Sequence, residues 1–268
     1  MLISKRHIFT AFLLTTVLVV VYYLLNHYLD AGCWSGMKLS QTVAKHEYCE
    51  FSNMDAFLRQ KMNSYSNLAY FFFGMIIFLS GVSDHRTKNK SNRLTQFPAL
   101  SVLFGISLMY LCFGSTFFHA SLTWPGQRVD MNGTYSVAIS LLLIAVYRLF
   151  YSPGNEKLLK KIIPPLFFAL VLFFIYLHLV ISSLYLLPGM ILLVAAITVI
   201  NLLRHKTYKT IYAVVSFCLI VAAFIFRQTD VAKIGCDPYS LWQGHSAWHV
   251  LIGLGPSFLY LFYRSEKN

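Results

Sequence analysis

Eight apolar runs, each close to the length of a bilayer-crossing helix, constrain the fold more than any other feature of the sequence. A helix needs roughly 20 apolar residues to cross the hydrocarbon core of a membrane. The chain has 268 residues, 57% of them hydrophobic and only 12% charged, which is outside the range of ordinary soluble domains. We therefore predict an all-α, polytopic membrane protein, with spans near 8–26, 66–83, 97–119, 131–151, 163–182, 184–203, 210–227 and 243–263.

The basic residues predict how these spans are oriented. A formal net charge of +12 could indicate a nucleic-acid partner, but the Lys and Arg residues alternate between loops and form no single patch, which argues against one. Under the positive-inside rule, the richer set of segments is cytoplasmic. Both termini are then cytoplasmic, and the segments near 27–65, 120–130, 183 and 228–242 face outward. The richer set holds fifteen of the twenty-two: Lys5, Arg6, Arg86, Lys88, Lys90, Arg93, Arg148, Lys157, Lys160, Lys161, Arg204, Lys206, Lys209, Arg264 and Lys267.

Residues 1–28 hold the first apolar run, which could be a signal peptide or a retained anchor helix. We favour the anchor, because the run is long for a signal peptide. Residues 29–65 follow as a polar outer segment. Cys33, Cys49 and Cys236 all fall in outward segments, where disulfides are permitted, and the residues alone do not choose the pair.

Two histidines begin the last apolar run, in the stretch "QGHSAWHVLIGLG". His245 and His249 are four residues apart, so a helix projects both from one face, where their ring nitrogens can bind one metal ion. His119 ends its own span at the same outer level and can supply a third imidazole. Three histidines and one water make the open arrangement of a catalytic zinc site, and imidazole ligands favour zinc over magnesium or calcium. The alternative is three interfacial histidines bonded to loops, but ionisable groups within spans are costly and usually functional.

Ser115 and Asp130 flank the third histidine in "GSTFFHASLTWPGQRVD". Ser115 lies one helical turn before His119, and Asp130 opens the next span after an outer turn that contains Trp124, Pro125 and Gly126. An isolated Asp here is usually a helix N-cap, and an isolated Ser usually bonds its own backbone. Beside a zinc-bound water, Asp130 could accept a proton and Ser115 could donate to an oxyanion.

Four stretches together resemble the signature regions of the alkaline ceramidases, which belong to a superfamily of seven-helix membrane hydrolases and receptors. The resemblance covers nearly the whole chain from about residue 47. The stretches are "EYCEFSN" at 47–53, "NSYSNLAYFFFG" at 63–74, "GSTFFHASLTWPGQRVD" at 114–130 and "QGHSAWHVLIGLG" at 243–255.

The resemblance implies a fold and a reaction. Residues 66–264 would form a seven-helix membrane core, with residues 1–28 as an extra N-terminal transmembrane helix. His119, His245 and His249 would bind zinc, with Ser115 and Asp130 at the catalytic water. It also implies a Cys49–Cys236 disulfide and hydrolysis of the amide bond of a ceramide-like lipid, with membrane lipids as the surroundings.

A calcium site in the outer segment fits this sequence less well. The resemblance places such a site near Glu47, Tyr48, Glu50 and Asn53, whose oxygens could bind calcium. The chain has Gln60 where the family has a further Glu, so solvated loop acids are the favoured interpretation.

Three other functions remain open from the sequence. A zinc-containing receptor of the progestin or adiponectin type would have its metal toward the cytoplasm, whereas the charge pattern here puts it outward. A metal transporter would need ligands near mid-membrane, where these spans have few. A lipid-remodelling hydrolase acting on another acyl lipid remains open, because fold similarity does not define a substrate.

Overall fold

The computed structural model describes residues 3–89, 91–205 and 207–267, and within them the chain is helical, with two isolated β-bridges and no strand. Lys90 and Lys206, which the charge argument counted, lie outside the described residues. Eight helices in the described part have 20 to 27 residues: α1 (Lys5–Tyr28), α4 (Leu68–Thr87), α6 (Pro98–Ser121), α7 (Trp124–Phe150), α8 (Glu156–Val180), α9 (Ser183–Arg204), α10 (Ile211–Val231) and α11 (Gly244–Arg264). The short helices are η1 (Ala31–Trp34), α2 (Gln41–Ala44), α3 (Lys61–Ser66) and α5 (Arg93–Gln96).

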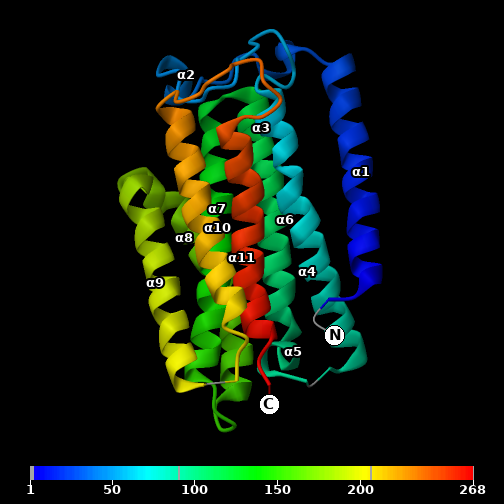
Figure 1. Ribbon diagram of the computed structural model, residues 1–268, viewed down its shortest axis with the longest axis vertical. Helices are drawn as coiled ribbons and strands as arrows, with labels where there is room; N and C mark the ends of the chain where they lie inside the picture. The colour runs from blue at the N-terminus through cyan, green and yellow to red at the C-terminus, as the bar shows by residue number, and fades with distance from the viewer. Residues whose placement is uncertain (1–2, 90, 206, 268) are drawn as a thin grey trace.

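Seven helical segments of the described chain are long and apolar enough to cross a membrane. They are α1, the combined segment of α3 and α4 (Lys61–Thr87), and α6 to α10, so the protein is an integral multi-pass membrane protein. Helix α11 has the length but is not among these segments, and it carries His245, His249 and further polar residues. It packs against α10 and runs along the bundle beside it (Figure 1), so its membrane crossing stays a prediction.

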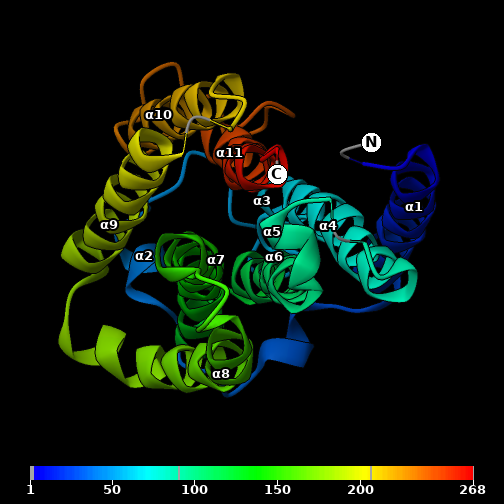
Figure 2. The same ribbon diagram turned by 90° about the horizontal axis from the view of Figure 1, so that it is seen from below.

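The long helices run up and down the bundle, so that both termini lie at one end (Figure 1). The polar outer segment and the loop between α10 and α11 lie together at the opposite end. Seen along the bundle, α4, α6, α7 and α11 form its centre, with α8, α9 and α10 in an arc on one side (Figure 2). The most extensive helix contacts are those of α6 with α4 and α7 and of α10 with α11.

Helix α1 stands at the edge of the bundle, beyond α4 (Figure 2). Only 11% of its most apolar 18-residue stretch is buried inside the protein, so most of the α1 side chains are left to contact lipid. Its polar contacts with the rest of the chain include the hydroxyl of Tyr22, which donates to Thr116 Oγ1 at 3.0 Å, and Oδ1 of Asn26, which accepts from the backbone N–H of Leu58 at 2.9 Å. The extra N-terminal helix outside the core is therefore confirmed.

Two glycines let α6 and α7 approach closely. A Cβ on Gly114 would lie 3.0 Å from the carbonyl oxygen of Val129, and one on Gly133 would lie 2.8 Å from the Cα of Leu111. A side chain at either position would force the helices apart, because packed interiors leave no room for an added methyl group. This contact holds the α7 segment around Asp130 against α6.

The turn between α6 and α7 is shorter than the sequence suggested. Helix α7 already begins at Trp124, and its N-cap is Thr123, whose side chain accepts a hydrogen bond from the backbone N–H of Gly126. Pro125 fits the first helical turn, where the N–H that proline lacks has no helical partner. Asp130 therefore lies in the second turn of α7, and the N-cap alternative for it was wrong.

Candidate metal centre

Three histidines from two helices meet at the end of the bundle opposite the termini. His119 lies near the end of α6, and His245 and His249 lie in the first two turns of α11. One ring nitrogen from each lies within 4.8 Å of the others, and the side chains are 0%, 5% and 2% exposed. Neutral imidazoles this close together and this well buried match the donors of a zinc site better than those of a hard cation.

His119 presents a free nitrogen to this centre. Its Nδ1 lies 2.7 Å from Oε1 of Gln60, an oxygen that only accepts, so the proton is on Nδ1. The opposite atom, Nε2, is buried and has no hydrogen-bond partner. A buried nitrogen lone pair without a partner is costly, and a bound metal ion would satisfy it.

His249 follows the same pattern. Its Nδ1 lies 2.7 Å from the hydroxyl oxygen of Ser66, and that hydroxyl donates its own proton to the backbone oxygen of Asn63. Ser66 therefore accepts from His249, which places the proton on Nδ1 and leaves Nε2 for a metal. Metal-binding histidines usually donate their second ring N–H to an acceptor in this way.

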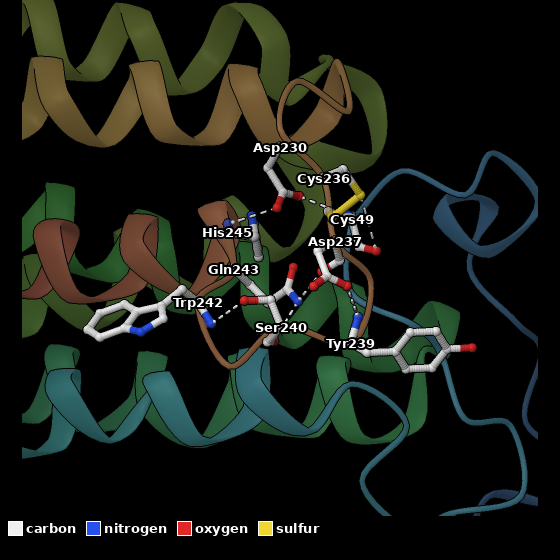
Figure 3. Close-up of a disulfide and its surroundings, with 9 residues drawn as sticks. All are labelled: Cys49, Asp230, Cys236, Asp237, Tyr239, Ser240, Trp242, Gln243 and His245. Carbon is white, nitrogen blue, oxygen red and sulfur yellow. Dashed lines mark hydrogen bonds between the residues drawn. A yellow bond between two sulfur atoms is a disulfide. The ribbon is translucent and has the colours of Figure 1, made fainter.

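His245 is held through its backbone. Its N–H donates to Oδ1 of Asp230 at 3.1 Å, while Oδ2 of Asp230 accepts from the backbone N–H of Cys49 at 3.1 Å (Figure 3). The ring Nδ1 of His245 is buried without a partner. Two of the three histidines thus have an orphaned buried nitrogen, and the residues fit a metal ion.

The disulfide Cys49–Cys236 ties the outer segment to the loop before α11, with an S–S distance of 2.02 Å (Figure 3). Of the three cysteines that the sequence predicted to face outward, Cys33 is free and exposed. The pairing is the one that the family resemblance implied. It holds the outer segment beside the first turn of α11, where His245 lies.

Ser115 and Asp130 are brought together across the contact between α6 and α7. The hydroxyl of Ser115 is buried and donates a hydrogen bond to the carboxylate of Asp130. Ser115 precedes His119 by one turn of α6, so the pair lies on the side of α6 that carries the histidine. The rings of Tyr48 and Tyr70 lie against those of His245 and His249.

Tyr48 covers the centre from the outer segment. Its ring lies 4.2 Å from that of His245 and 5.2 Å from that of His119, measured between centroids. Burial, followed by the nearby charge of Glu47, raises the pKa of Tyr48 well above its usual value, so the hydroxyl stays protonated. A cavity of about 390 Å³ lies beside Tyr48 and Gln60 and reaches both disulfide cysteines.

The residues named for calcium have other partners in the structure. Glu47 forms an ion pair with Arg227, and Asn53 Oδ1 accepts from the backbone N–H of Asp55. Glu50 accepts from the backbone N–H groups of Met62 and Asn63, where α3 begins. Burial raises the pKa of Glu50 to about 7, although these two hydrogen bonds oppose the shift. Calcium binding stays an untested prediction.

Three residues of the centre were not found from the sequence as partners of the histidines: Gln60, Ser66 and Asp230. Gln60 was noted only as a departure from the family's calcium site. A polar residue just before an apolar run is a weak signal, because most such residues face water. Only the packing of the outer segment against α6 and α11 shows which ring nitrogens these side chains contact.

The described chain is helical and spans the membrane, and three buried histidines meet at one end of its bundle. These are the features of a membrane metalloprotein. Comparison with known families matches residues 40–265 to the ceramidase family model, which covers most of the chain. The chain belongs to the ceramidase family, and membership implies amidohydrolase activity. Among curated proteins, no sequence matches this chain.

Proposed function

We propose that the protein is a zinc-dependent hydrolase that cleaves the amide bond of a ceramide-like lipid, releasing a sphingoid base and a fatty acid. The observation that carries the proposal is the group of His119, His245 and His249, whose ligand atoms lie within 4.8 Å of one another in a buried site. Membership of the ceramidase family supports the amide bond and the lipid.

Each residue of the site has a separate task in this reaction. Zinc held by the three histidines would make water acidic enough to lose a proton near neutral pH and would polarise the amide carbonyl. Asp130 accepts the proton from the attacking water and then passes it to the leaving amine. Ser115 donates a hydrogen bond to the oxyanion of the tetrahedral intermediate, for which it turns its hydroxyl away from Asp130.

The outer helices support a substrate that arrives from the membrane. In the most apolar 18-residue stretches of α8, α9 and α10, only 11% to 22% is buried inside the protein. These helices therefore offer broad apolar faces to lipid chains. Helix α10 packs against α11, which carries two of the histidines. A lipid could therefore keep its chains among apolar side chains while its amide reaches the centre.

The centre faces the outer or lumenal side in this proposal, and both termini are cytoplasmic. His119 lies near the end of α6, and His245 and His249 lie near the start of α11. These helix ends are at the end of the bundle opposite the termini (Figure 1). That end has the fewer Lys and Arg residues, and the positive-inside rule places such an end outside. This orientation distinguishes the proposal from a receptor with a cytoplasmic metal.

The test is incubation of the purified protein with a panel of ceramides and other acyl lipids, with products identified by mass spectrometry. We expect free sphingoid base from ceramides, loss of activity with a zinc chelator and recovery when zinc is restored. The His245→Ala/His249→Ala double variant should bind no zinc. His178 is also buried but lies on α8 outside the centre, so His178→Ala is the matched control and should keep its zinc.

Two results would contradict the proposal. Full zinc content in the double variant would show that His245 and His249 do not bind the zinc. Release of fatty acid from another acyl lipid, with ceramides untouched, would leave a hydrolase but replace the substrate.

A further inference from the structure

The outer segment contributes a buried amide, Gln60, to the histidine centre. Gln60 is 3% exposed, and its backbone N–H also donates to the carbonyl oxygen of His119 at 3.0 Å. Gln60 therefore holds His119 at two points, through its backbone and through its side-chain oxygen at 2.7 Å from Nδ1. The backbone bond satisfies a carbonyl oxygen at the end of α6, but the side-chain contact between Oε1 of Gln60 and Nδ1 of His119 does nothing for the helix itself.

The orientation of the Gln60 amide follows from its other neighbours. Its Nε2 donates to Ser52 Oγ at 3.1 Å, while its Oε1 also lies 3.4 Å from Nδ2 of Asn63. Asn63 in turn accepts from the hydroxyl of Ser246 through Oδ1 at 2.9 Å, so its Nδ2 is a donor. Oε1 of Gln60 is therefore the atom that faces His119, and it can only accept.

We propose that Gln60 is a positioning residue that holds His119 in the tautomer with Nδ1 protonated, and so sets the metal affinity of the centre. The proposal rests on the metal centre of the proposed function. With the proton on Nδ1, the lone pair is on Nε2, the buried atom that lacks a partner. Without Gln60, the other tautomer would cost less, and its Nε2–H could not bind a metal.

The same chain of hydrogen bonds joins the two helices that carry the ligands. It runs from His119 on α6 through Gln60 and Asn63 to Ser246, which lies on α11 between the other two histidines. Gln60 thus connects the orientation of one ligand to the helix that carries the other two. A connected and satisfied polar network of this kind rigidifies a site.

The experiment measures zinc affinity of the purified, folded protein by competition with a chelator of known affinity. Gln60→Met keeps the length of the side chain but lacks a strong acceptor, and we expect its zinc Kd to rise about 10–100-fold. Gln60→Glu keeps an acceptor oxygen at the same reach and should remain within a few fold of the wild type. Gln60→Asn keeps the amide but is one methylene shorter, so its oxygen no longer reaches His119. Its zinc Kd should rise above the wild-type value, toward that of Gln60→Met.

A matched control separates positioning from the loss of any buried amide. Asn201 is fully buried on α9 and donates through Nδ2 to the carbonyl oxygen of Ala145 and to the hydroxyl of Tyr263, away from the histidines. Asn201→Leu should lower the thermal unfolding midpoint and leave zinc affinity unchanged. If folded Gln60→Met binds zinc with wild-type affinity, the inference about Gln60 is wrong, and the proposed function is unaffected. Zinc binding without hydrolysis in the wild type would overturn only the proposed function.

Discussion

Asp130 is the residue whose role depends most on what surrounds it. In the second turn of α7 it cannot cap the helix, and it accepts a hydrogen bond from Ser115 on the neighbouring helix. A half-buried carboxylate one helix away from three buried histidines has an evident use as a proton acceptor. The same position would also suit a purely structural hydrogen bond to Ser115, so the two roles need an experiment.

Asp130→Asn distinguishes these roles at the residue scale. The amide keeps the size and shape of the side chain and can still accept from Ser115, but it cannot take a proton from water. We expect normal folding and zinc content with turnover lowered about 10²–10⁴-fold, the usual contribution of a general base. Zinc analysis and a hydrolysis assay on one preparation measure both. Near-normal turnover with normal zinc would exclude the proton-transfer role.

At the scale of elements, Asp230 joins three parts of the chain. It lies at the end of α10, and its carboxylate accepts from the first turn of α11 and from the outer segment at Cys49 (Figure 3). An anion at a helix N-terminus is favourable, because the first N–H groups have no partners within the helix. Gly244 permits this approach, since a Cβ there would lie 2.9 Å from both the Asp230 Cβ and the Phe226 carbonyl oxygen.

We expect Asp230→Ala to destabilise the protein by about 1–3 kcal/mol for each of the two buried N–H groups that it leaves unpaired. The thermal unfolding midpoint in detergent should then fall by roughly 4–24 °C, at about 2–4 °C for each kcal/mol. Asp237→Ala is the control, because this exposed carboxylate in the loop between α10 and α11 accepts only from the backbone N–H of Tyr239 among the bonds shown (Figure 3). Equal midpoints for the two variants would show that Asp230 does not hold α11 in place.

For the whole molecule, the main question is which end faces the cytoplasm. The disulfide and the histidines share one end of the bundle, and most of the Lys and Arg residues belong to the other. Disulfides persist in oxidising compartments, so Cys49–Cys236 and the charge distribution point to the same orientation. The two arguments are independent, because one concerns redox chemistry and the other concerns insertion.

Cys33 provides a direct test of this orientation. It is a free, exposed cysteine in the outer segment, whereas Cys112 is buried and Cys218 lies within the apolar helix α10. A membrane-impermeant maleimide should label Cys33 from the outer or lumenal side of sealed membranes, and Cys33→Ala should abolish the labelling.

The control uses the opposite end of the bundle. Ser152 is exposed in the loop between α7 and α8, so Ser152→Cys in the Cys33→Ala background should react only after the membrane is opened. If Ser152→Cys is labelled in sealed membranes and Cys33 is not, the orientation is the opposite of the one proposed. That result would favour a receptor-like arrangement.

The sequence alone predicted the helical membrane fold and the three histidines, because both depend on local patterns. Hydropathy over about 20 residues reports a membrane helix directly, and a spacing of four places His245 and His249 on one face of a helix. The boundaries were less accurate at the turn after α6, where "TWPGQ" looked like a loop. Proline at the start of a helix and proline in a turn are alike in sequence, so the position of Thr123 as the cap was needed to decide.

The partners that orient the histidines were decided only by the tertiary structure. Gln60 and His119 are 59 residues apart, Ser66 and His249 are 183 apart, and Asp230 acts on a neighbouring helix. Local propensity carries no information about such pairs, since each polar residue would be as stable facing water. The packing of the outer segment against the ends of α6 and α11 removes that water. The hydrogen bonds that replace it then determine which ring nitrogens of His119 and His249 carry a proton and which are free to bind a metal.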